Sequence, residues 1–519
     1  MHTPLKRKSE SRNYIMKLLT RSALAISVTL CGLAMPLRAA DERPQSVLRA
    51  HAPDYLRTVR EYADAMIDHG RDTYGSVKSP AFAATLDRKT MKLPEGKAAE
   101  RIEHILRSNW GIRAGDRTLA GANPMHDQNL YQVLYALTKA TGDERYAKQA
   151  DEALRWFFEN CRSSTTGLLA WGEHMGWDFR LEGPIRDTHE FARPWVLWDR
   201  CFPLAPEACK RYARGLWEHQ IGNQKTGNFS RHASFRRHGP GTNSQYPRHG
   251  GFYILTWSHA YKNTQDPVFA KAIETVLNHF ETRRNPNTGA IPSESASRSR
   301  EKNVWPESNL SLAIDLWTGS TMVPGELSKK MRACARKTDE VYLKLAHDLG
   351  PGGRGFVSGA NADTLEPYAT GPWTGTRTWE TAYGKYTDAQ DAMMCLCRWR
   401  QVEDDGYKRL FTAAADRYVT NDPDFDAVVW PGAMGDAVML LTEVYRETGE
   451  KRYLDRAERL AARSVATFFP DGSPLPKASS LHDHYEAITR GDTLVMALLN
   501  LWAAKTRPDL DLGLTWSER

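Results

Sequence analysis

The side chains best suited to acid–base chemistry gather between Thr226 and Tyr253. No Asp or Glu occurs between Glu218 and Asp266, although 26% of the chain is charged. The segment instead carries Asn228, Arg231, His232, His238, Asn243, Tyr246, Arg248 and His249. Its repeated Gly and Pro residues predict a loop, and loops on a rigid scaffold often carry function. A solvated basic loop is the plain alternative, but such a loop has no need of this mixture of His, Tyr, Asn and Arg.

Together these groups favour proton transfer beside a negative charge that the protein stabilises. Asn and Arg side chains donate hydrogen bonds to charge that develops on an oxygen. An imidazole titrates near neutral pH, so His232 or His249 is a candidate base, with His238 as a further candidate. Tyr246 is a candidate acid, or both acid and base.

Helical hairpins are expected to hold this segment in place. Apolar periodicity predicts helices in pairs, at residues 127–141 with 144–160, 190–202 with 206–220, 249–263 with 267–283, 307–319 with 326–348, 387–402 with 406–419, and 433–447 with 451–468. A last helix at 487–504 is expected to pair with one at 52–69 or at 97–108. Similar turns around Gly142, Asp266 and Gly449 indicate a repeated unit whose copies pack on one another. The pattern therefore predicts one all-α domain of six or seven hairpins.

The connections between the pairs are long, whereas those within the pairs are short. In an antiparallel array the long connections lie at one end, where the first helix of each pair begins. Helix N-termini present N–H groups and a positive dipole end, which favours an anionic ligand. Polar residues stand at several of these starts, namely His126, Asp127, His189, Glu190, Glu307, Tyr386, Asp388, Asp436, Tyr485 and Glu486. For any one of the acids, helix capping is the plain alternative.

Several tryptophans lie in or beside the long loops, namely Trp171, Trp177, Trp305, Trp373 and Trp379. Flat aromatic rings suit the apolar faces of pyranose sugars, whereas tryptophans within helices more often fill a core. The loops therefore favour a sugar-like ligand.

The paired helices, the loops on one face and the motifs NFSRH (228–232) and YPRHGGFY (246–253) resemble the exported α/α-toroid polysaccharide lyases. Those enzymes act on uronic-acid glycans and include alginate, glucuronan and pectate lyases. The resemblance implies an (α/α)6 or (α/α)7 toroid, an incomplete barrel of helical hairpins. Many such lyases add a β-sandwich domain, which this sequence does not predict.

The resemblance also implies cleavage of a 4-linked uronide by β-elimination, with Tyr246, His232 and His249 as catalytic residues. Arg and Asn would neutralise the carboxylate and so make the neighbouring C5 proton easier to remove. The expected substrate-binding residues are Asn228, Arg231, His238, Asn243, Arg248, His189, Glu190, Arg377, Tyr383 and Trp171.

Two other functions fit the same scaffold. A glycoside hydrolase needs two carboxylic acids that flank the scissile bond, and Glu190, Glu307, Asp388 and Asp436 could supply such a pair. A non-catalytic glycan-binding protein would use the tryptophan-lined loops for capture. The products distinguish the three, because only a lyase leaves an unsaturated sugar end.

Residues 1–40 predict an export signal, since basic residues precede an apolar run from Ala23 to Met35 and then Ala39 and Ala40. They hold seven of the 70 Lys and Arg and one of the 63 Asp and Glu, so the rest of the chain has a net charge of about +1. Residues 41–519 are expected to form a single toroid domain, with residues 41–110 closing the ring. We expect a periplasmic or secreted protein whose partner is an anionic polysaccharide, with neither nucleic acid nor membrane as a partner.

Six cysteines follow the predicted signal; an oxidising compartment permits disulfides, and Cys201 with Cys209 is the most plausible pair, but spacing alone does not fix the connectivity. No CxxC or HExxH motif occurs, so the sequence predicts no zinc site and no cofactor. Loop acids such as Asp178, Asp187 and Asp363 could bind Ca²⁺, but their spacing matches no recognised calcium loop.

Overall fold

The structure is a computed structural model that describes residues 54–109, 112, 114–237, 245–293, 302–371, 373–380 and 385–519. By its contacts the chain divides into Met1–Ala52 and Pro53–Arg519, and the described residues belong to the second unit. The predicted export signal and the candidate residues His238, Asn243 and Tyr383 lie outside the described residues. Within the described part of the chain, no helix has both the length and the apolar character needed to cross a membrane.

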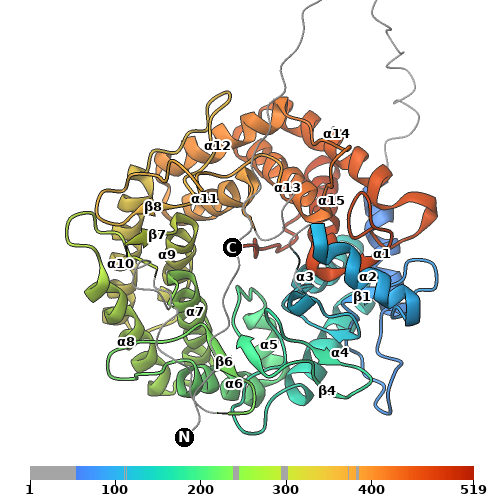
Figure 1. The fold of residues 1–519 in the computed structure, drawn as a ribbon, viewed down its shortest axis with the longest axis horizontal. Helices are drawn as coiled ribbons and strands as arrows, with labels where there is room; N and C mark the ends of the chain where they lie inside the picture. The colour runs from blue at the N-terminus through green and yellow to red at the C-terminus, as the bar shows by residue number, and fades with distance from the viewer. Residues whose placement is uncertain are drawn as a thin grey trace, which may run out of the picture. The chain divides into compact units, whose positions relative to one another are not determined.

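Fourteen of the fifteen α-helices in the described residues form an inner and an outer layer around a common centre (Figure 1). The inner helices are α3 (Gln128–Thr141), α5 (Trp198–Leu204), α7 (Pro247–Thr264), α9 (Pro306–Ser320), α11 (Asp388–Val402), α13 (Pro431–Thr448) and α15 (Gly491–Thr506). The outer helices are α1 (Tyr55–His69), α4 (Glu144–Asn160), α6 (Pro206–His219), α8 (Pro267–Arg283), α10 (Gly325–Lys344), α12 (Asp405–Thr420) and α14 (Lys451–Phe468). Helix α2 (Gly96–Asn109) lies in the connection between α1 and α3.

Each inner helix packs against the outer helix that follows it, and α15 packs against α1. Inner helices also contact one another around the ring, from α5 through α7, α9, α11 and α13 to α15, which contacts α3. The predicted α/α toroid is therefore confirmed, with seven helical pairs. The sequence left open whether the last helix pairs with the one predicted at 52–69 or the one at 97–108. It pairs with the first of these, because α15 contacts α1.

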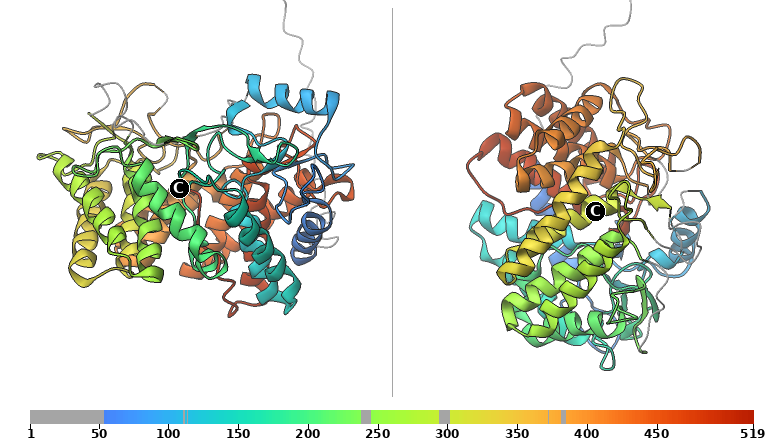
Figure 2. Two further views of the ribbon diagram at one scale, coloured as in Figure 1. Left: turned by 90° about the horizontal axis from the view of Figure 1, so that it is seen from below. Right: turned by 90° about the vertical axis from the view of Figure 1, so that its left-hand side faces the viewer.

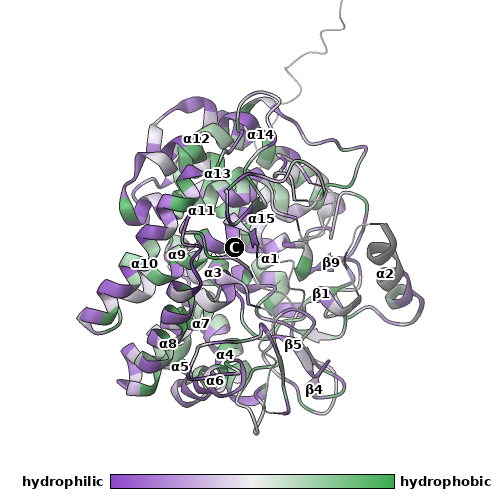
Figure 3. Cartoon of the chain, turned by 60° about the vertical axis from the view of Figure 1, so that its left-hand side comes forward, coloured by the Kyte–Doolittle hydropathy of each residue, from purple (hydrophilic) through white to green (hydrophobic). Residues whose placement is uncertain are grey.

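Local sequence explains both the turns and the layers. Gly142 and Gly449 end helices with φ of 76° and 72°, a left-handed conformation that glycine adopts without strain. The side chain of Asp266 accepts a hydrogen bond from the N–H of Val268 and so caps α8. Inner helix α15 is buried on nearly all sides, whereas outer helices such as α12 carry both hydrophobic and hydrophilic residues (Figure 3).

The long connections between pairs gather at one end of the ring (Figure 2, left). They contain the nine short strands of the described residues: β1 (Thr85–Leu86), β2 (Gly121–Ala122), β3 (Trp177–Asp178), β4 (Gly183–Pro184), β5 (Thr188–Glu190), β6 (His232–Ser234), β7 (Asn303–Val304), β8 (Ala360–Asn361) and β9 (Tyr485–Glu486). The pairs β1–β9, β2–β3, β3–β4, β5–β6 and β7–β8 are all antiparallel. Three short 3₁₀ helices occupy Ala114–Asp116, Pro470–Gly472 and Ala487–Thr489. In the described residues these strands form no β-sandwich, as expected.

Two expectations about the second hairpin are wrong. The helix predicted at residues 190–202 begins only at Trp198, and residues 188–190 form strand β5 instead. Pro194 explains the late start, because proline disfavours helical backbone in the residue before it. The predicted Cys201–Cys209 disulfide is also absent, since all six described cysteines are free. Both thiols are buried in the core, and burial raises the pKa of each.

A buried ion pair joins the first and last parts of the ring. Arg117 donates to both carboxylate oxygens of Glu486 at 2.7 and 2.6 Å, and both side chains are fully buried. Nearby, strand β1 pairs with β9, and the Tyr62 and Tyr485 hydroxyls lie 3.1 Å apart. Burial alone raises the pKa of Glu486, but Arg117 and His484 outweigh it and lower this pKa to about 2.

We therefore expect Arg117→Met to lower the free energy of unfolding by about 3–5 kcal/mol, because it leaves the Glu486 carboxylate buried without its cation. Denaturant titration measures this loss. A folded-state pKa below the unfolded value means that Glu486 stabilises the wild type above about pH 4.3 and stops doing so as the pH falls toward 2. Arg180→Met, which removes an exposed partner of Glu95, should cost less than about 1 kcal/mol. Equal losses in the two variants would contradict the expected role of the buried pair.

Candidate active site

Two adjoining cavities open among the loops at the N-terminal end of the inner helices. The first, here called the central cavity, has a volume of about 250 Å³ and is lined by residues from the starts of α3, α7, α11, α13 and α15. The second, the aromatic cavity, has a volume of about 470 Å³ and is lined by residues from the starts of α7, α9 and α11 and by the loop between β8 and α11. They share Arg248, Glu380, Lys385 and Tyr386. The location matches the cleft expected from the loop lengths.

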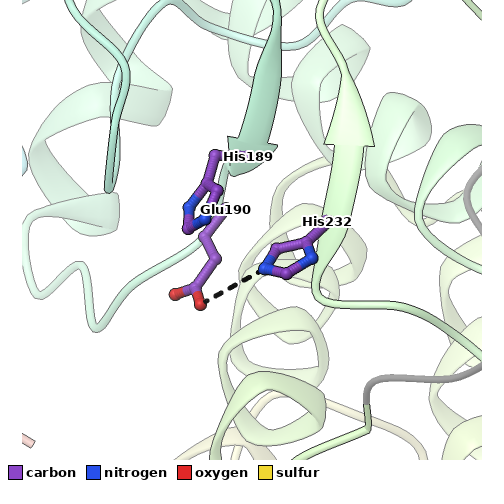
Figure 4. Close-up of side chains that lie close together, drawn as sticks. All are labelled: His189, Glu190 and His232. Atoms are coloured by element: carbon purple, nitrogen blue, oxygen red, sulfur yellow. Dashed lines mark ion pairs between the residues drawn. The ribbon is translucent and has the colours of Figure 1, made fainter. Parts of the chain in front are cut away.

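Strands β5 and β6 bring Glu190 opposite His232 (Figure 4). Glu190 is 2% exposed, and its carboxylate forms an ion pair with Arg231 and accepts from His249 Nε2 at 2.9 Å. His232 Nε2 lies 4.0 Å from the same carboxylate. A buried carboxylate needs such partners. Glu190 is therefore the centre of a polar cluster formed with Arg231, His249 and His232.

A stack of imidazoles extends from this cluster. The ring centroids of His174 and His189 lie 3.8 Å apart, and those of His189 and His232 lie 4.5 Å apart. His189 Nδ1 is 3.3 Å from Glu173, yet burial outweighs this carboxylate and lowers the pKa of His189 to about 3. His189 is therefore neutral at pH 7 and offers a nitrogen lone pair rather than a charge.

Tyr246 stands at the N-cap of α7 between two guanidinium groups. Its ring centroid lies 5.1 Å from Cζ of Arg231 and 5.9 Å from Cζ of Arg248. The backbone N–H of Arg248 donates to Ser308 Oγ at 3.0 Å, and its side chain donates to the Tyr386 hydroxyl at 3.3 Å. Because Arg231, Tyr246 and Arg248 all line the aromatic cavity, a ligand there meets two cations and a phenol at once.

The two glycines of the YPRHGGFY motif explain how α7 is placed. A Cβ atom on Gly250 would meet the Phe280 ring at 2.3 Å, and one on Gly251 would meet Asp315 Oδ2 at 2.8 Å. These glycines let α7 approach its neighbours α8 and α9 closely. The approach fixes Tyr246 and Arg248 at the cavity wall.

Other candidate residues lie elsewhere in the site or outside it. Arg377 lines the aromatic cavity, as expected for a residue on the opposite side. His249 is 1% exposed and contacts Glu190 instead of lining either cavity. Burial, with Arg248 and Arg231 nearby, lowers its pKa well below the usual range. Asn228 lies in a turn paired with Asn223 and lines neither cavity.

The expected sugar-stacking role of Trp171 is wrong. Its side chain is fully buried, and it packs against Phe158, Trp195 and Tyr212. Its indole N–H donates to the carbonyl of Phe191 at 3.2 Å. A ring enclosed in this way has no face available to a sugar, so Trp171 belongs to the core under the site.

Several cavity residues had no role in the sequence-based site, namely Glu173, Arg193, Lys385, Glu518 and Arg519. The sequence offered a weak signal for Glu173, which stands with His174 between two loop tryptophans. It offered none for the last residues of the chain, which reach the centre of the ring (Figure 1). There Arg519 pairs with Asp315 at 2.6 Å, and Glu518 pairs with Arg490 at 3.0 Å.

Two groups of side chains in the described residues have the donor types and the proximity that a metal ion needs. The first is His189, Glu190 and His232, and the second is Asp116, Glu173 and His174. Within each group the possible ligand atoms lie within 4.8 Å of one another. Two imidazoles and a carboxylate suit ions such as Zn²⁺ or Mn²⁺.

The seven helical pairs form an α/α toroid, and the cleft at the N-terminal end of its inner helices is lined by arginines and aromatic rings. The family model described as "Periplasmic pectate lyase" matches residues 98–272, from α2 to the first turns of α8. This match confirms the resemblance to polysaccharide lyases of uronic-acid glycans that the sequence suggested.

Three solved structures are similar to this chain in backbone fold. Cellobiose 2-epimerase from Bacillus thermoamylovorans B4167 has a TM-score of 0.47 and 10% identity, with 87% of this chain and 99% of that chain covered. An unsaturated glucuronyl hydrolase specific for heparin has a TM-score of 0.46 and 11% identity, with coverage of 88% and 99%. A family 76 glycoside hydrolase from a bovine Bacteroides thetaiotaomicron strain has a TM-score of 0.44 and 10% identity, with coverage of 87% and 78%.

Proposed function

We propose that this protein is a periplasmic or secreted polysaccharide lyase that cleaves a 4-linked uronic-acid glycan by β-elimination. The observation that carries the proposal is the meeting of Arg231, Tyr246 and Arg248 at one cavity wall. The two guanidinium groups suit a uronate carboxylate, and the phenol between them can transfer a proton. The family described as periplasmic pectate lyases supports both the reaction and a galacturonan as the first substrate to test.

The reaction balances with the groups present. Arg231 and Arg248 bind the carboxylate and stabilise the charge that develops on its oxygens as a base removes the C5 proton. The C5–H electron pair forms the C4–C5 double bond while the C4–O bond breaks. Tyr246 protonates the departing oxygen, which becomes a hydroxyl of the other product.

His232 is the candidate base among the imidazoles. Its side chain is 35% exposed, whereas those of His174, His189 and His249 are 17%, 18% and 1% exposed. His232 is therefore the most exposed of the four; it lines neither cavity itself, but it follows Arg231, which lines the aromatic cavity. His249 serves to hold the Glu190 carboxylate at 2.9 Å, and Glu190 in turn holds Arg231.

The reaction type is tested by incubating the protein separately with polygalacturonate, polyglucuronate and polymannuronate. The expected result is rising ultraviolet absorbance from the conjugated unsaturated product, first with polygalacturonate. Saturated reducing ends without that absorbance would identify a hydrolase. Binding without either product would identify a glycan-binding protein, and each of these two results contradicts the proposal.

A glycoside hydrolase is the second candidate because of one observation. Glu190, Asp388 and Asp436 each form an ion pair with an arginine. Glu307 and Asp391, by contrast, line the aromatic cavity, and each has a carboxyl oxygen without a hydrogen-bond partner in the described protein. Burial raises the pKa of both, that of Glu307 to about 7, as a carboxylic acid that donates a proton requires.

A divalent cation at His189, Glu190 and His232 also fits the site, although the sequence predicted no metal. The fit rests on the ligand types: two imidazoles and one buried carboxylate come together from the paired strands β5 and β6. A cation held there would attract the uronate carboxylate and withdraw charge from it. His232 would then be a ligand and could not take the C5 proton, so Tyr246 would act as both base and acid. Since Glu190 also pairs with Arg231, metal binding would compete with that ion pair.

We therefore expect Mn²⁺ or Zn²⁺ to bind the wild-type protein and His232→Ala to abolish that binding in a calorimetric titration. Treatment with a chelator should lower the elimination rate at least about tenfold, and added cation should restore it. His69→Ala, which changes an exposed histidine at the end of α1, is the control and should bind the cation like the wild type. Equal binding by the wild type and His232→Ala would rule out this metal site.

A further inference from the structure

The far wall of the aromatic cavity consists of aromatic side chains that the proposed reaction does not use. Trp305 and Trp373 lie with their ring centroids 5.0 Å apart and their planes at 62°, and Tyr368 is beside them. Trp373 is 41% exposed, although it lines a cavity of about 470 Å³. Pockets of this size accept a small ligand, and an exposed indole face suits the apolar face of a sugar.

Four buried polar atoms around this wall have no hydrogen-bond partner in the described residues: Trp305 Nε1, Ser358 Oγ, Glu307 Oε2 and Asp391 Oδ1. All four side chains belong to residues that line the aromatic cavity. Asp391 is 2% exposed, so its carboxyl oxygen has no access to bulk solvent to offset the missing partner. Such groups cost stability when they stay unsatisfied, which indicates that a ligand completes them.

The four atoms require a ligand that both donates and accepts hydrogen bonds. An indole N–H only donates, a hydroxyl does both, and a carboxyl accepts and, when protonated, also donates. The hydroxyl groups along one edge of a pyranose meet this requirement. A second carboxylate does not, because it offers no hydrogen-bond donor.

The charges around the two acids agree with this requirement. Burial raises the pKa of Glu307 to about 7, although Arg248 opposes the shift. Burial raises the pKa of Asp391 as well, and Glu307 and Asp388 add to the effect. Burial thus favours the protonated form of both carboxyl groups, which can donate to sugar hydroxyls.

We propose that the far wall of the aromatic cavity, around Trp373, Glu307 and Asp391, is a second sugar subsite, which binds the pyranose next to the one held by Arg231 and Arg248 at the opposite wall. The bound ring lies with its apolar face on Trp373 and its hydroxyl edge toward Glu307 and Asp391. This inference rests on the proposed function, since it assumes a uronic-acid chain with one carboxylate at the two arginines. It adds that the neighbouring sugar is recognised by its hydroxyls.

The test compares Trp373→Ala with the wild type on oligogalacturonates of increasing length. The wild-type kcat/KM should rise once the chain is long enough to fill the second subsite. Trp373→Ala should raise KM for the longer chains about tenfold and leave kcat and the shortest cleaved chain nearly unchanged. Asp391→Asn, which keeps the volume of the side chain, should raise KM for the longer chains about three- to tenfold.

Trp379→Ala is the matched control, because Trp379 is on the same loop but packs against Tyr418 and donates to the carbonyl of Asn421. It lines a separate depression and should leave the length dependence unchanged. Equal effects of Trp373→Ala and Trp379→Ala, or no effect of Trp373→Ala, would overturn the subsite. Loss of turnover in Asp391→Asn on every chain length would also overturn it, since that result assigns Asp391 to the chemistry.

A binding measurement separates failure of the subsite from failure of the proposed function. Calorimetric titration with a saturated oligogalacturonate needs no catalysis, and Trp373→Ala should weaken binding about tenfold relative to Trp379→Ala. If the wild type produces no unsaturated ends but this difference in affinity is present, the lyase proposal fails and the subsite stands. If elimination occurs and the two variants bind equally, the subsite fails and the lyase proposal stands.

Discussion

Tyr246→Phe is expected to lower kcat/KM for elimination by about 10²- to 10⁴-fold while the affinity for oligosaccharide stays close to that of the wild type. The variant removes a single oxygen. The ring that Arg231 and Arg248 contact at 5.1 and 5.9 Å stays in place, so the cations keep their positions. Without the phenol, the departing oxygen has to leave as an unprotonated alkoxide, which raises the barrier to cleavage. Initial rates from the ultraviolet absorbance of the product, together with calorimetric affinities, measure both effects.

The control for this variant is Tyr261→Phe, which makes the same change near the other end of α7, away from both cavities. Its activity should match that of the wild type. Full activity in Tyr246→Phe would show that another group protonates the departing oxygen. A parallel loss of affinity would instead assign Tyr246 to binding.

The helical frame could be predicted because its signals are local. Apolar periodicity and the turns at Gly142, Asp266 and Gly449 locate α3, α4, α7, α8, α13 and α14 to within a few residues. The same locality explains the error at the second hairpin. There Pro194 and a three-residue strand interrupt a sequence that otherwise looks helical, and such a short strand has no periodicity of its own.

The candidate site could be predicted only in part, because its contacts are long-range. The acid-free segment identified Arg231, His232, Tyr246 and Arg248, which the structure brings to one region. The pairing of Glu190 with His232 depends on the register of β5 and β6, which no local pattern specifies. Trp171 shows the opposite error, since a loop residue can fill a core when the loop folds back onto the helices.

The electrostatics of the cleft combine a general and a specific contribution. The inner helices present their N-termini to the cavities, which gives a diffuse preference for anions. Arg231 and Arg248 add two directed cations, and they do so beside Tyr246. Removal of one directed cation should therefore affect the chemical step far more than removal of a surface charge affects it.

Arg231→Ala is accordingly expected to lower kcat by about 10²- to 10³-fold, because it removes a donor from the carboxylate on which charge develops in the transition state. Burial lowers the pKa of Arg231, which indicates a guanidinium held in a partly dehydrated site where its interactions are strong. If Arg231 acted only in ground-state binding, KM would rise and kcat would stay unchanged. Steady-state kinetics on oligogalacturonate separate these outcomes.

The matched control is Arg237→Ala, because Arg237 is on the same connection as Arg231 but is 80% exposed, and it lies 3.6 Å from Asp187. It should change kcat less than twofold, since an exposed ion pair contributes little.

Arg231→Ala also leaves Glu190 without its guanidinium partner. A second variant, Arg231→Lys, therefore keeps the positive charge and tests whether the geometry of the guanidinium group matters. Arg231→Lys should fold like the wild type in thermal unfolding and still lose most of its kcat, because an ammonium group cannot bind a carboxylate through two parallel hydrogen bonds. Wild-type kcat in Arg231→Lys would mean that charge alone suffices, and an equal loss in Arg237→Ala would move the carboxylate-binding role away from Arg231.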